Sequence, residues 1–270
     1  MNHRSNLLDL AGPVPVFAPA ARLAGRICLV MGATSGIGQA TALRMADEGA
    51  AAVVVTGRRQ ELGLALAQEI RHRGSDGLFL ACDVTREAEI ADVVAQVTSR
   101  FGRLDVAFNN AGFQERRAPL AKQDDAVYTE VFDTNVRAVF HAMRREIMAM
   151  QASGGGAIVN NASVSGIRNP NPGLSLYSAS KAAVISLTRA AAMEYAKEGI
   201  RINAIAPGRV VTDMMLNSGI ADMNAVAAGL PLGRMGHPQE VAAALVWLAS
   251  NESGFVVGHC LAVDGGFLAG

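Results

Sequence analysis

Short apolar runs alternate with helical stretches from residue 26 onward, and this alternation constrains the fold more than any other feature of the chain. The runs ICLVMGA, AAVVVTG and GLFLACDV are apolar at nearly every position, as expected of strands that are buried on both faces. Each is followed by a segment with helical apolar spacing, such as RQELGLALAQEIRHRG or EAEIADVVAQVTSRFG. Strands joined in this way predict a doubly wound α/β fold, with one parallel sheet covered by helices on both sides.

The same pattern continues through the rest of the chain without a break in composition or an internal repeat. LDVAFNNAG, GAIVNNAS, IRINAIAPG and HCLAVDGG are the later expected strands, and one long helical region is expected over DDAVYTEVFDTNVRAVFHAMRREIMAMQ. We therefore predict a single domain over residues 22–270. Residues 1–21 contain three prolines and no long apolar core. We expect them to form an irregular N-terminal extension, which could serve as an arm on a neighbouring subunit, and not a signal peptide or a membrane span.

Composition excludes several classes of partner. The 270 residues include 24 basic and 24 acidic side chains, so the formal net charge is zero and no basic tract suggests nucleic acid. No segment suggests a membrane. The three cysteines, Cys28, Cys82 and Cys260, are far apart and lack metal-ligand spacing. We expect reduced thiols in a cytoplasmic protein that has no metal site.

A glycine-rich turn, VMGATSGIGQA, lies where the first expected strand meets the first helix. Its glycines, Gly32, Gly36 and Gly38, permit a tight turn, a close approach of a pyrophosphate to the backbone, and close packing of helix on sheet. The free N–H groups at the start of the helix favour phosphate. Strand–helix turns also need glycine for purely steric reasons, so it is the position after the first strand that favours dinucleotide binding.

The end of the second strand bears on which dinucleotide is bound. An acidic residue there would accept a hydrogen bond from the adenosine ribose 2′-OH. The sequence instead has Gly57, followed by Arg58 and Arg59. A guanidinium is a fixed fork of donors that suits a 2′-phosphate, so we predict NADP(H) in preference to NAD(H). The alternative is that both arginines are simply solvated at the start of a helix.

A tyrosine and a lysine four residues apart, Tyr177 and Lys181, lie near the start of the helix expected over SASKAAVISLTRAAAMEYAKEG. Residues at this spacing share one helical face. A nearby ammonium favours the phenolate and should lower the tyrosine pKa from about 10. Such a phenol can protonate a carbonyl oxygen or deprotonate an alcohol. An ordinary contact on a helix surface is the alternative interpretation of the pair.

These motifs and their order resemble the short-chain dehydrogenase/reductase family over roughly residues 22–270. The turn has the family spacing G-x-x-x-G-I-G, and NNAG, the Y-x-x-x-K pair, the APG segment and VDGG follow in the family order. Met31 stands where the family usually has threonine. The resemblance implies a Rossmann-like, three-layer αβα domain. It also implies an enzyme that transfers a hydride between a nicotinamide cofactor and a ketone or secondary alcohol.

The resemblance further implies the roles of individual residues. Ser163 would orient the substrate oxygen, with Ser165 as the less favoured alternative, and Asn135 would hold a water that relays protons to Lys181. Together with Tyr177 these form the expected catalytic tetrad of Asn135, Ser163, Tyr177 and Lys181. The residues expected along the cofactor are Gly32, Thr34, Ser35, Gly36, Ile37, Gly38, Arg58, Arg59, Asp83, Val84, Asn109, Asn110, Ala111, Gly112, Tyr177, Lys181, Pro207, Gly208, Val210 and Thr212.

The substrate is expected to be apolar, because flexible methionines suit an adaptable pocket wall. The segment after Thr212 corresponds to the variable substrate loop of the family and contains Met214, Met215, Leu216, Met223 and Leu230. Burial of these side chains against the body of the domain is an equal alternative. Three arginines, Arg116, Arg117 and Arg168, could instead attract an anionic carrier, as in a 3-oxoacyl-acyl-carrier-protein reductase.

Two further expectations concern the oligomeric state of the protein and the functional class to which it belongs. Relatives pack the helices around FDTNVRAVFHAM and ISLTRAAAMEYA across subunit interfaces, so we predict a homotetramer with D₂ symmetry. A non-catalytic dinucleotide-binding sensor on the same fold is the alternative from another class, because a fold does not guarantee activity. Lyase or epimerase chemistry from the same tyrosine is a third possibility. The complete tetrad argues against the sensor, and the short segment after Thr212 argues against the lyase or epimerase.

Overall fold

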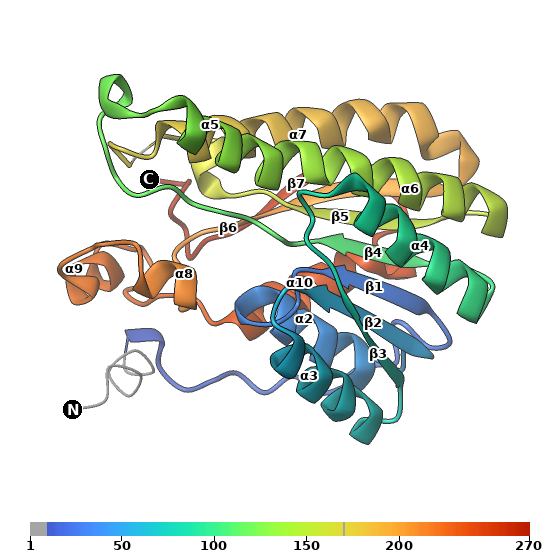
Figure 1. Cartoon of the computed structure of the whole chain (residues 1–270). Coiled ribbons are helices and arrows are strands. Elements are labelled where there is room, and N and C mark those ends of the chain that lie inside the picture. The colour runs from blue at the N-terminus through green and yellow to red at the C-terminus, as the bar shows by residue number, and fades with distance from the viewer. Residues whose placement is uncertain (1–9, 170) are drawn as a thin grey trace.

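The computed structural model describes residues 10–169 and 171–270, and its centre is a seven-stranded parallel sheet (Figure 1). The strand order is β3-β2-β1-β4-β5-β6-β7. The chain therefore builds outward from β1 to β3 and then crosses back to β4, which is the topology of a doubly wound fold. The strands are β1 (Ile27–Met31), β2 (Ala52–Gly57), β3 (Asp76–Ala81), β4 (Val106–Asn109), β5 (Gly156–Asn161), β6 (Ile200–Pro207) and β7 (Cys260–Val263).

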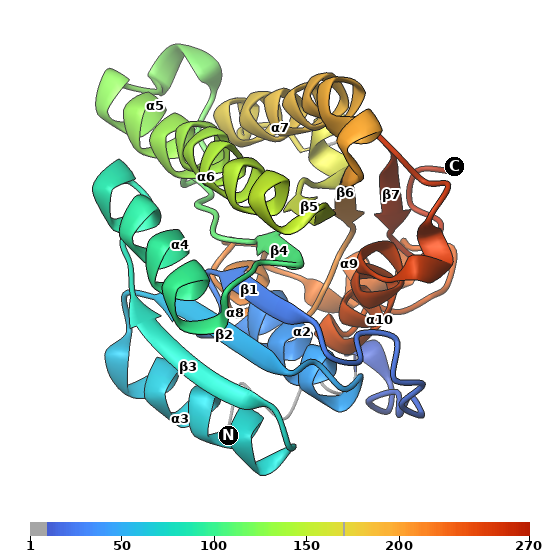
Figure 2. The same cartoon turned by 90° about the vertical axis from the view of Figure 1, so that its right-hand side faces the viewer.

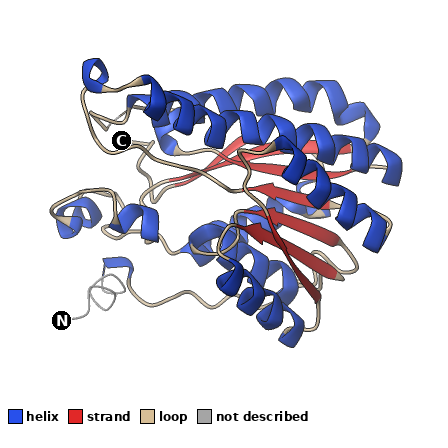
Figure 3. Cartoon of the chain, in the orientation of Figure 1, coloured by secondary structure: helices blue, strands red, loops and turns tan. Residues whose placement is uncertain are grey.

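Helices cover both faces of the sheet, which confirms the predicted three-layer architecture (Figures 2 and 3). In Figure 2, α2, α3 and α10 lie on one face, and α4, α6 and α7 lie on the other. The helices are α2 (Gly36–Asp47), α3 (Gln60–His72), α4 (Glu87–Phe101), α5 (Asp125–Phe132), α6 (Ala138–Ser153), α7 (Ser175–Tyr195), α8 (Asp213–Leu216), α9 (Met223–Ala228) and α10 (Pro238–Ala249).

Strand β1 shows why the expected strands are apolar at consecutive positions. Side chains alternate between the two faces of a strand. Ile27, Leu29 and Met31 therefore pack in the core formed with α4, α6 and α7, whereas Cys28 and Val30 pack in the core formed with α2, α3 and α10. Each face of the strand meets a layer of helices, so no position is left for a polar side chain.

The long helical region expected after Pro119 is confirmed, because helical turns run without a gap from Asp125 to Ser153. Its middle is a π-helical turn, η2 (Asp133–Arg137), which lies between α5 and α6 and has Asn135 at its centre. The Asn135 amide bonds to main-chain groups of Phe113 on a neighbouring loop and holds the turn against it.

The described part of the N-terminal extension packs on its own chain. Ala11 is buried in a small apolar cluster with Met215, Leu230 and Met235, beneath α8 and α9. The main-chain N–H of Met235 donates a 3.0 Å hydrogen bond to the oxygen of Leu10. The extension thus supports the segment expected to form the substrate loop. Residues 1–9 of the predicted extension lie outside the described residues.

No helix in the described ranges combines the length and apolar character needed to cross a membrane. Within the same ranges, no three His, Cys, Asp or Glu side chains are grouped so that they could hold a metal ion.

Candidate active site

A cleft of about 490 Å³ opens at the carboxyl ends of the parallel strands. It extends from the glycine-rich turn after β1 to the first turn of α7, and residues that follow β1, β2, β3, β4, β5 and β6 line it. Ligands of doubly wound sheets bind at this edge, where the strand order reverses. The motifs identified in the sequence therefore meet in one place.

The glycine-rich turn needs its glycines for close backbone approach. Gly32 has φ +82°, and a Cβ there would lie 2.7 Å from the main chain of Ala111. A Cβ on Gly38 would overlap the main-chain oxygen of Gly32. The turn consequently lies directly against the loop after β4 and leaves its backbone open to the cleft. This cradle fits the pyrophosphate of a dinucleotide, because a side chain would fill it.

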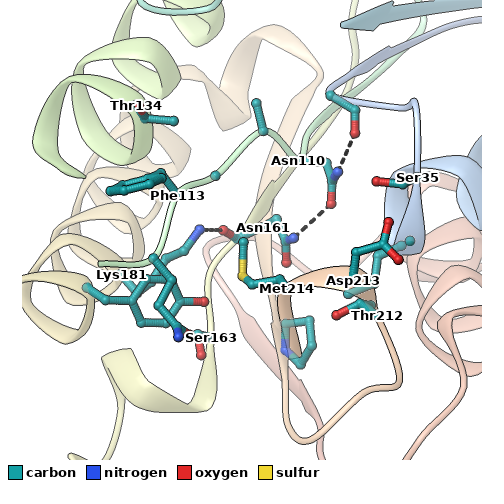
Figure 4. A pocket seen from close by; sticks show the side chains of 18 of the residues that line it. Ser35, Asn110, Phe113, Thr134, Asn161, Ser163, Lys181, Thr212, Asp213 and Met214 are labelled. Atoms are coloured by element: carbon teal, nitrogen blue, oxygen red, sulfur yellow. Dashed lines mark hydrogen bonds between the residues drawn. The ribbon is translucent and has the colours of Figure 1, made fainter. Parts of the chain in front are cut away.

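Three hydrogen bonds connect the expected catalytic lysine to this turn (Figure 4). Lys181 Nζ donates to the main-chain oxygen of Asn161 at 2.7 Å, and Asn161 Nδ2 donates to Asn110 Oδ1 at 2.8 Å. Asn110 Nδ2 then donates to the main-chain oxygen of Gly32 at 2.6 Å. Asn161 was not identified from the sequence, although a polar residue at the end of an apolar strand was a usable signal.

Tyr177 lies in the first turn of α7 and is 9% exposed. Its main-chain N–H and that of Leu176 donate to the carboxylate of Glu115, which thereby caps the helix. Lys181 lies one turn further along, and its Nζ is 5.7 Å from the centroid of the Tyr177 ring. The predicted pair therefore shares one face at the cleft. The capping residue Glu115 was not identified from the sequence.

The direction of the Tyr177 pKa shift differs from the sequence expectation. Burial raises the pKa of Tyr177 above its ordinary value, and this outweighs the lowering effects of hydrogen bonding to Ser163 and of the Arg209 charge. Burial also lowers the pKa of Lys181 to about 8. The expectation of a lowered tyrosine pKa was wrong for this structure because desolvation disfavours both charged forms, the phenolate and the ammonium.

The two candidate serines occupy different positions. Ser163 follows β5 and hydrogen-bonds to Tyr177, and its Oγ also accepts a hydrogen bond of 3.1 Å from the main-chain N–H of Ser165. The Ser165 Oγ accepts instead from Asn171 Nδ2 at 3.2 Å. Both line the cleft, but the contact with the phenol favours Ser163 as the serine that faces the reacting oxygen.

Asn135 lies behind the cleft and is fully buried. Its Oδ1 accepts from the Phe113 N–H at 2.7 Å, and its Nδ2 donates to the Phe113 oxygen and to Ser180 Oγ. A Cβ built on Gly112 would lie 3.4 Å from Asn135 Oδ1 and 3.5 Å from Lys181 Nζ. Gly112 thus lies between the two polar side chains.

Asn109 does not belong to the cleft. Its Nδ2 donates to Glu146 Oε2 and to Asn160 Oδ1, both at 2.9 Å, and the side chain is buried in the sheet layer. The prediction that Asn109 contacts the cofactor is therefore corrected. An alternating strand directs consecutive side chains to opposite faces, so Asn110 faces the glycine-rich turn while Asn109 faces α6. Gly38 and Asn135 are likewise outside the cleft lining, whereas the other predicted site residues lie in it.

The end of the cleft expected to bind the adenosine carries two arginines. Arg59 donates from Nε and Nη2 to Thr34 Oγ1 and from Nη2 to Ser35 Oγ, so it bridges the second strand and the glycine-rich turn. Partial burial raises the pKa of Asp83, but hydrogen bonds from Thr85 and the charge of Arg58 outweigh this effect. The pKa of Asp83 is therefore lower than its ordinary value. Arg58 and Arg59 thus place positive charge at this end of the cleft, and Asp83 provides an acceptor beside them.

The opposite end of the cleft contains part of the methionine-rich segment that follows Thr212. Met214 is 40% exposed and lines the cleft, while Met215 lines it but is also buried in the cluster with Ala11. Both interpretations of the methionine-rich segment therefore apply, one to each side chain. Phe113 and Arg209 also line this end and were not identified from the sequence.

Comparisons with known proteins agree with this geometry. A family model described as "Enoyl-(Acyl carrier protein) reductase" matches residues 32–268. An A-factor type gamma-butyrolactone 1′-reductase (1S-forming) of Streptomyces virginiae is 45% identical over 91% of this chain and 96% of its own. A cis-4-hydroxycyclohexanecarboxylate dehydrogenase of Sinomonas cyclohexanicum is 43% identical over 91% of this chain and 98% of its own.

Among solved structures, levodione reductase superposes with a TM-score of 0.87 at 34% identity, over 92% of this chain and 99% of its own. The fold, the order of the motifs and these relatives agree with one another. The chain belongs to the short-chain dehydrogenase/reductase family and is an NAD(P)-dependent oxidoreductase acting on CH–OH groups.

Proposed function

We propose that Tyr177 is the general acid and base of this oxidoreductase, with Ser163, Lys181 and Asn135 as its partners. The observation that carries the proposal is the meeting of Tyr177, Ser163 and Lys181 at one end of the cleft that begins at the glycine-rich turn. A bound nicotinamide cofactor supplies or accepts the hydride. The protein's part is to hold the substrate oxygen and to move one proton.

Each side chain has a distinct task in this proposal. Ser163 Oγ donates a hydrogen bond to the substrate oxygen, and the Tyr177 hydroxyl gives its proton to that oxygen during reduction or takes it during oxidation. Lys181, held by the Asn161 oxygen, positions the nicotinamide ribose and adds positive charge near the phenol. Asn135 holds the loop of Phe113 and the water that relays protons to Lys181.

Replacing Tyr177 with phenylalanine tests the role of the hydroxyl. The variant keeps the buried ring and loses only the phenolic oxygen, so we expect turnover to fall by about a thousandfold or more while the Kd of NADPH changes little. Steady-state kinetics and a fluorescence titration with NADPH measure the two quantities. Turnover close to that of the wild type would reject Tyr177 as the acid and base.

The preferred cofactor in this proposal is NADP(H). Support comes from Gly57, which offers no carboxylate, and from Arg58 and Arg59, which line the cleft at the end of β2. The ratio of KM for NADH to KM for NADPH measures the preference, and the double replacement R58A/R59A should reduce it to near one. A tenfold preference of the wild type for NADH would overturn the assignment.

The proposed substrate is a small ketone or secondary alcohol with an apolar body. Met214, Leu174 and Phe113 line the substrate end of the cleft and supply apolar wall. The Sinomonas relative is named for cis-4-hydroxycyclohexanecarboxylate, a secondary alcohol on a ring. A 3-oxoacyl-acyl-carrier-protein reductase is the second candidate, because a relative from Thermotoga maritima that is 37% identical carries that name. An NADPH-oxidation screen separates them, because activity on acyl-thioesters alone would reject the simple ketone.

We further propose that the protein is a homotetramer of D₂ symmetry and that it is located in the cytoplasm. We also propose that residues 22–270 form the catalytic domain and that residues 1–21 are an extension of it. Exposed apolar side chains on the layer of α5, α6 and α7 support the assembly: Tyr128, Phe140, Met148 and Met193. The three free cysteines are compatible with a reducing compartment. Sedimentation of a 28.1 kDa species at micromolar concentration would reject the tetramer.

A further inference from the structure

Arg209 places a positive charge at the substrate end of the cleft. It follows β6 directly after Pro207 and Gly208, and it lines the cleft together with Ser163 and Tyr177. Burial raises the pKa of Tyr177, and the charge of Arg209 opposes this rise only in part. The guanidinium therefore belongs to the same cleft as the group proposed to protonate the substrate.

The side chain is held in place but is not neutralised. Arg209 Nη2 donates to Asn171 Oδ1, and the guanidinium lies over the Phe267 ring, with Cζ 5.7 Å from the ring centroid. The guanidinium has five N–H donors, yet the bond to Asn171 is its only hydrogen bond within residues 10–169 and 171–270. No carboxylate within these ranges forms an ion pair with Arg209. Burial lowers the pKa of Arg209, and the nearby Arg117 lowers it further.

Two carboxylates on this side of the molecule, Glu115 and Asp264, accept hydrogen bonds from main-chain donors. Glu115 accepts from Leu176 and Tyr177 at the start of α7. Asp264, whose main chain lies against Gly208, accepts from the N–H groups of Gly266 and Leu268. A partly buried guanidinium without a carboxylate partner is costly unless a ligand supplies the anion.

Two further arginines strengthen the positive potential here. Arg117 Nη1 donates to the main-chain oxygen of Pro172 at 3.1 Å. Arg168 Nη1 donates to the main-chain oxygen of Phe267 at 3.3 Å and to the oxygen of Gly270, and its Cζ lies 5.6 Å from the Phe267 ring centroid. An anion entering this end of the cleft would meet an attractive field.

We propose that Arg209 binds an anionic group, a carboxylate or a sulfonate, carried by the ketone or alcohol substrate. The planar guanidinium can take two oxygens of such a group in parallel hydrogen bonds. One end of the substrate is then fixed at Arg209, and its reacting oxygen lies between Ser163 and Tyr177. Because both ends bind in one cleft, the substrate is compact. This inference rests on the proposed function and adds a substrate class to it.

A matched pair of ketones tests the inference: 4-oxocyclohexanecarboxylate and its neutral carboxamide, reduced with NADPH at pH 7. The wild type should favour the carboxylate in kcat/KM. Replacing Arg209 with methionine should lower kcat/KM for the carboxylate by about 30-fold or more, mainly by raising KM. The same replacement should change kcat/KM for the carboxamide by less than about threefold. The Arg209→Lys variant keeps the charge but loses the planar fork of donors. Its kcat/KM for the carboxylate should therefore lie between those of the wild type and the Arg209→Met variant.

Arg100→Met is the control, because Arg100 is an exposed residue of α4 outside the cleft lining and its loss changes the net charge equally. This control variant should have the same kcat/KM as the wild type for both ketones. An equal loss for both ketones in the Arg209→Met variant would overturn the inference while leaving the ketone reductase standing. A higher KM for NADPH with unchanged ketone KM would also overturn it, because Arg209 would then serve the cofactor.

Binding separates failure of the inference from failure of the proposed function. If the wild type reduces neither ketone, calorimetry with cyclohexanecarboxylate and cyclohexanecarboxamide in the presence of NADPH still measures the anion preference. Tighter binding of the carboxylate by the wild type, and its loss in the Arg209→Met variant, supports the anion site. Equal binding of the acid and the amide rejects it.

Discussion

Lys181 Nζ lies 5.7 Å from the centroid of the Tyr177 ring and donates its hydrogen bond to the main-chain oxygen of Asn161. Ser163, and not Lys181, is the side chain that hydrogen-bonds to the phenol. The expected tetrad is thus organised as a pair of hydroxyl groups and a lysine anchored to the end of β5. Substitutions that affect Ser163 and substitutions that affect the surroundings of Lys181 should therefore have different effects on activity.

Ser163→Ala should shift the pH dependence of alcohol oxidation. Oxidation needs the phenolate of Tyr177, so kcat/KM rises with pH until the phenol is ionised. Hydrogen bonding to Ser163 lowers the pKa of Tyr177, and its loss should move the rising limb to higher pH, in addition to lowering the rate. A pH profile of alcohol oxidation for both proteins measures the shift. A lower rate with an unmoved limb would mean that Ser163 acts on the substrate alone.

Gly112→Ala should interrupt the proposed proton relay without unfolding the protein. The added methyl would lie 3.4 Å from Asn135 Oδ1 and 3.5 Å from Lys181 Nζ, which are ordinary contact distances. It would fill the space in which a relay water could lie, so kcat should fall by about tenfold to a hundredfold. Thermal unfolding and steady-state kinetics measure the two effects. An unchanged kcat in a folded variant would argue against a relay through this space.

Glu146→Gln should make stability less dependent on pH. Glu146 is fully buried in α6, burial raises its pKa to about 7, and its Oε1 and the Oδ1 of Asn109 find no partner among the described residues. The folded protein holds this proton where the unfolded chain, with a pKa of 4.5, has released it. The free energy of unfolding should therefore decrease as the pH rises from about 4.5 to about 7, by about 3 kcal/mol.

The glutamine variant lacks this titration and supplies an N–H donor for Asn109. It should match the wild type near pH 5 and exceed it at pH 8. Urea unfolding at both pH values measures the difference. Glu194→Gln, at an exposed position of α7, is the control and should follow the wild type at both pH values. A glutamine variant with the same pH slope as the wild type would show that Glu146 is ionised when buried.

Ala11→Asp should weaken the support of the substrate loop. Ala11 is 1% exposed and packs with Met215 and Met235, so a carboxylate there loses its solvation without a partner. We expect a higher KM for the ketone and little change in KM for NADPH, because the phosphate cradle is at the other end of the cleft. Val16→Asp is the control, since Val16 belongs to the same extension and is 95% exposed. Equal behaviour of the two variants would contradict the prediction.

Local patterns in the sequence were sufficient for the fold and for two parts of the cleft, and the family resemblance implied most of its other residues. The apolar runs, such as that of β1, predict a sheet covered on both sides because each strand alternates between two cores. Gly32 and the Tyr177–Lys181 pair were recognisable because tight turns and helical faces are set by residues close in sequence.

Only the tertiary structure decided the features that depend on residues distant in sequence. Asn109 and Asn110 are adjacent in the chain, yet one is buried against Glu146 and the other faces the glycine-rich turn. The partners of Arg209 and the upward shift of the Tyr177 pKa likewise follow from burial and from long-range neighbours. A sequence pattern determines which backbone conformations are favoured locally. The charge and solvation of a side chain are determined by what folding packs around it.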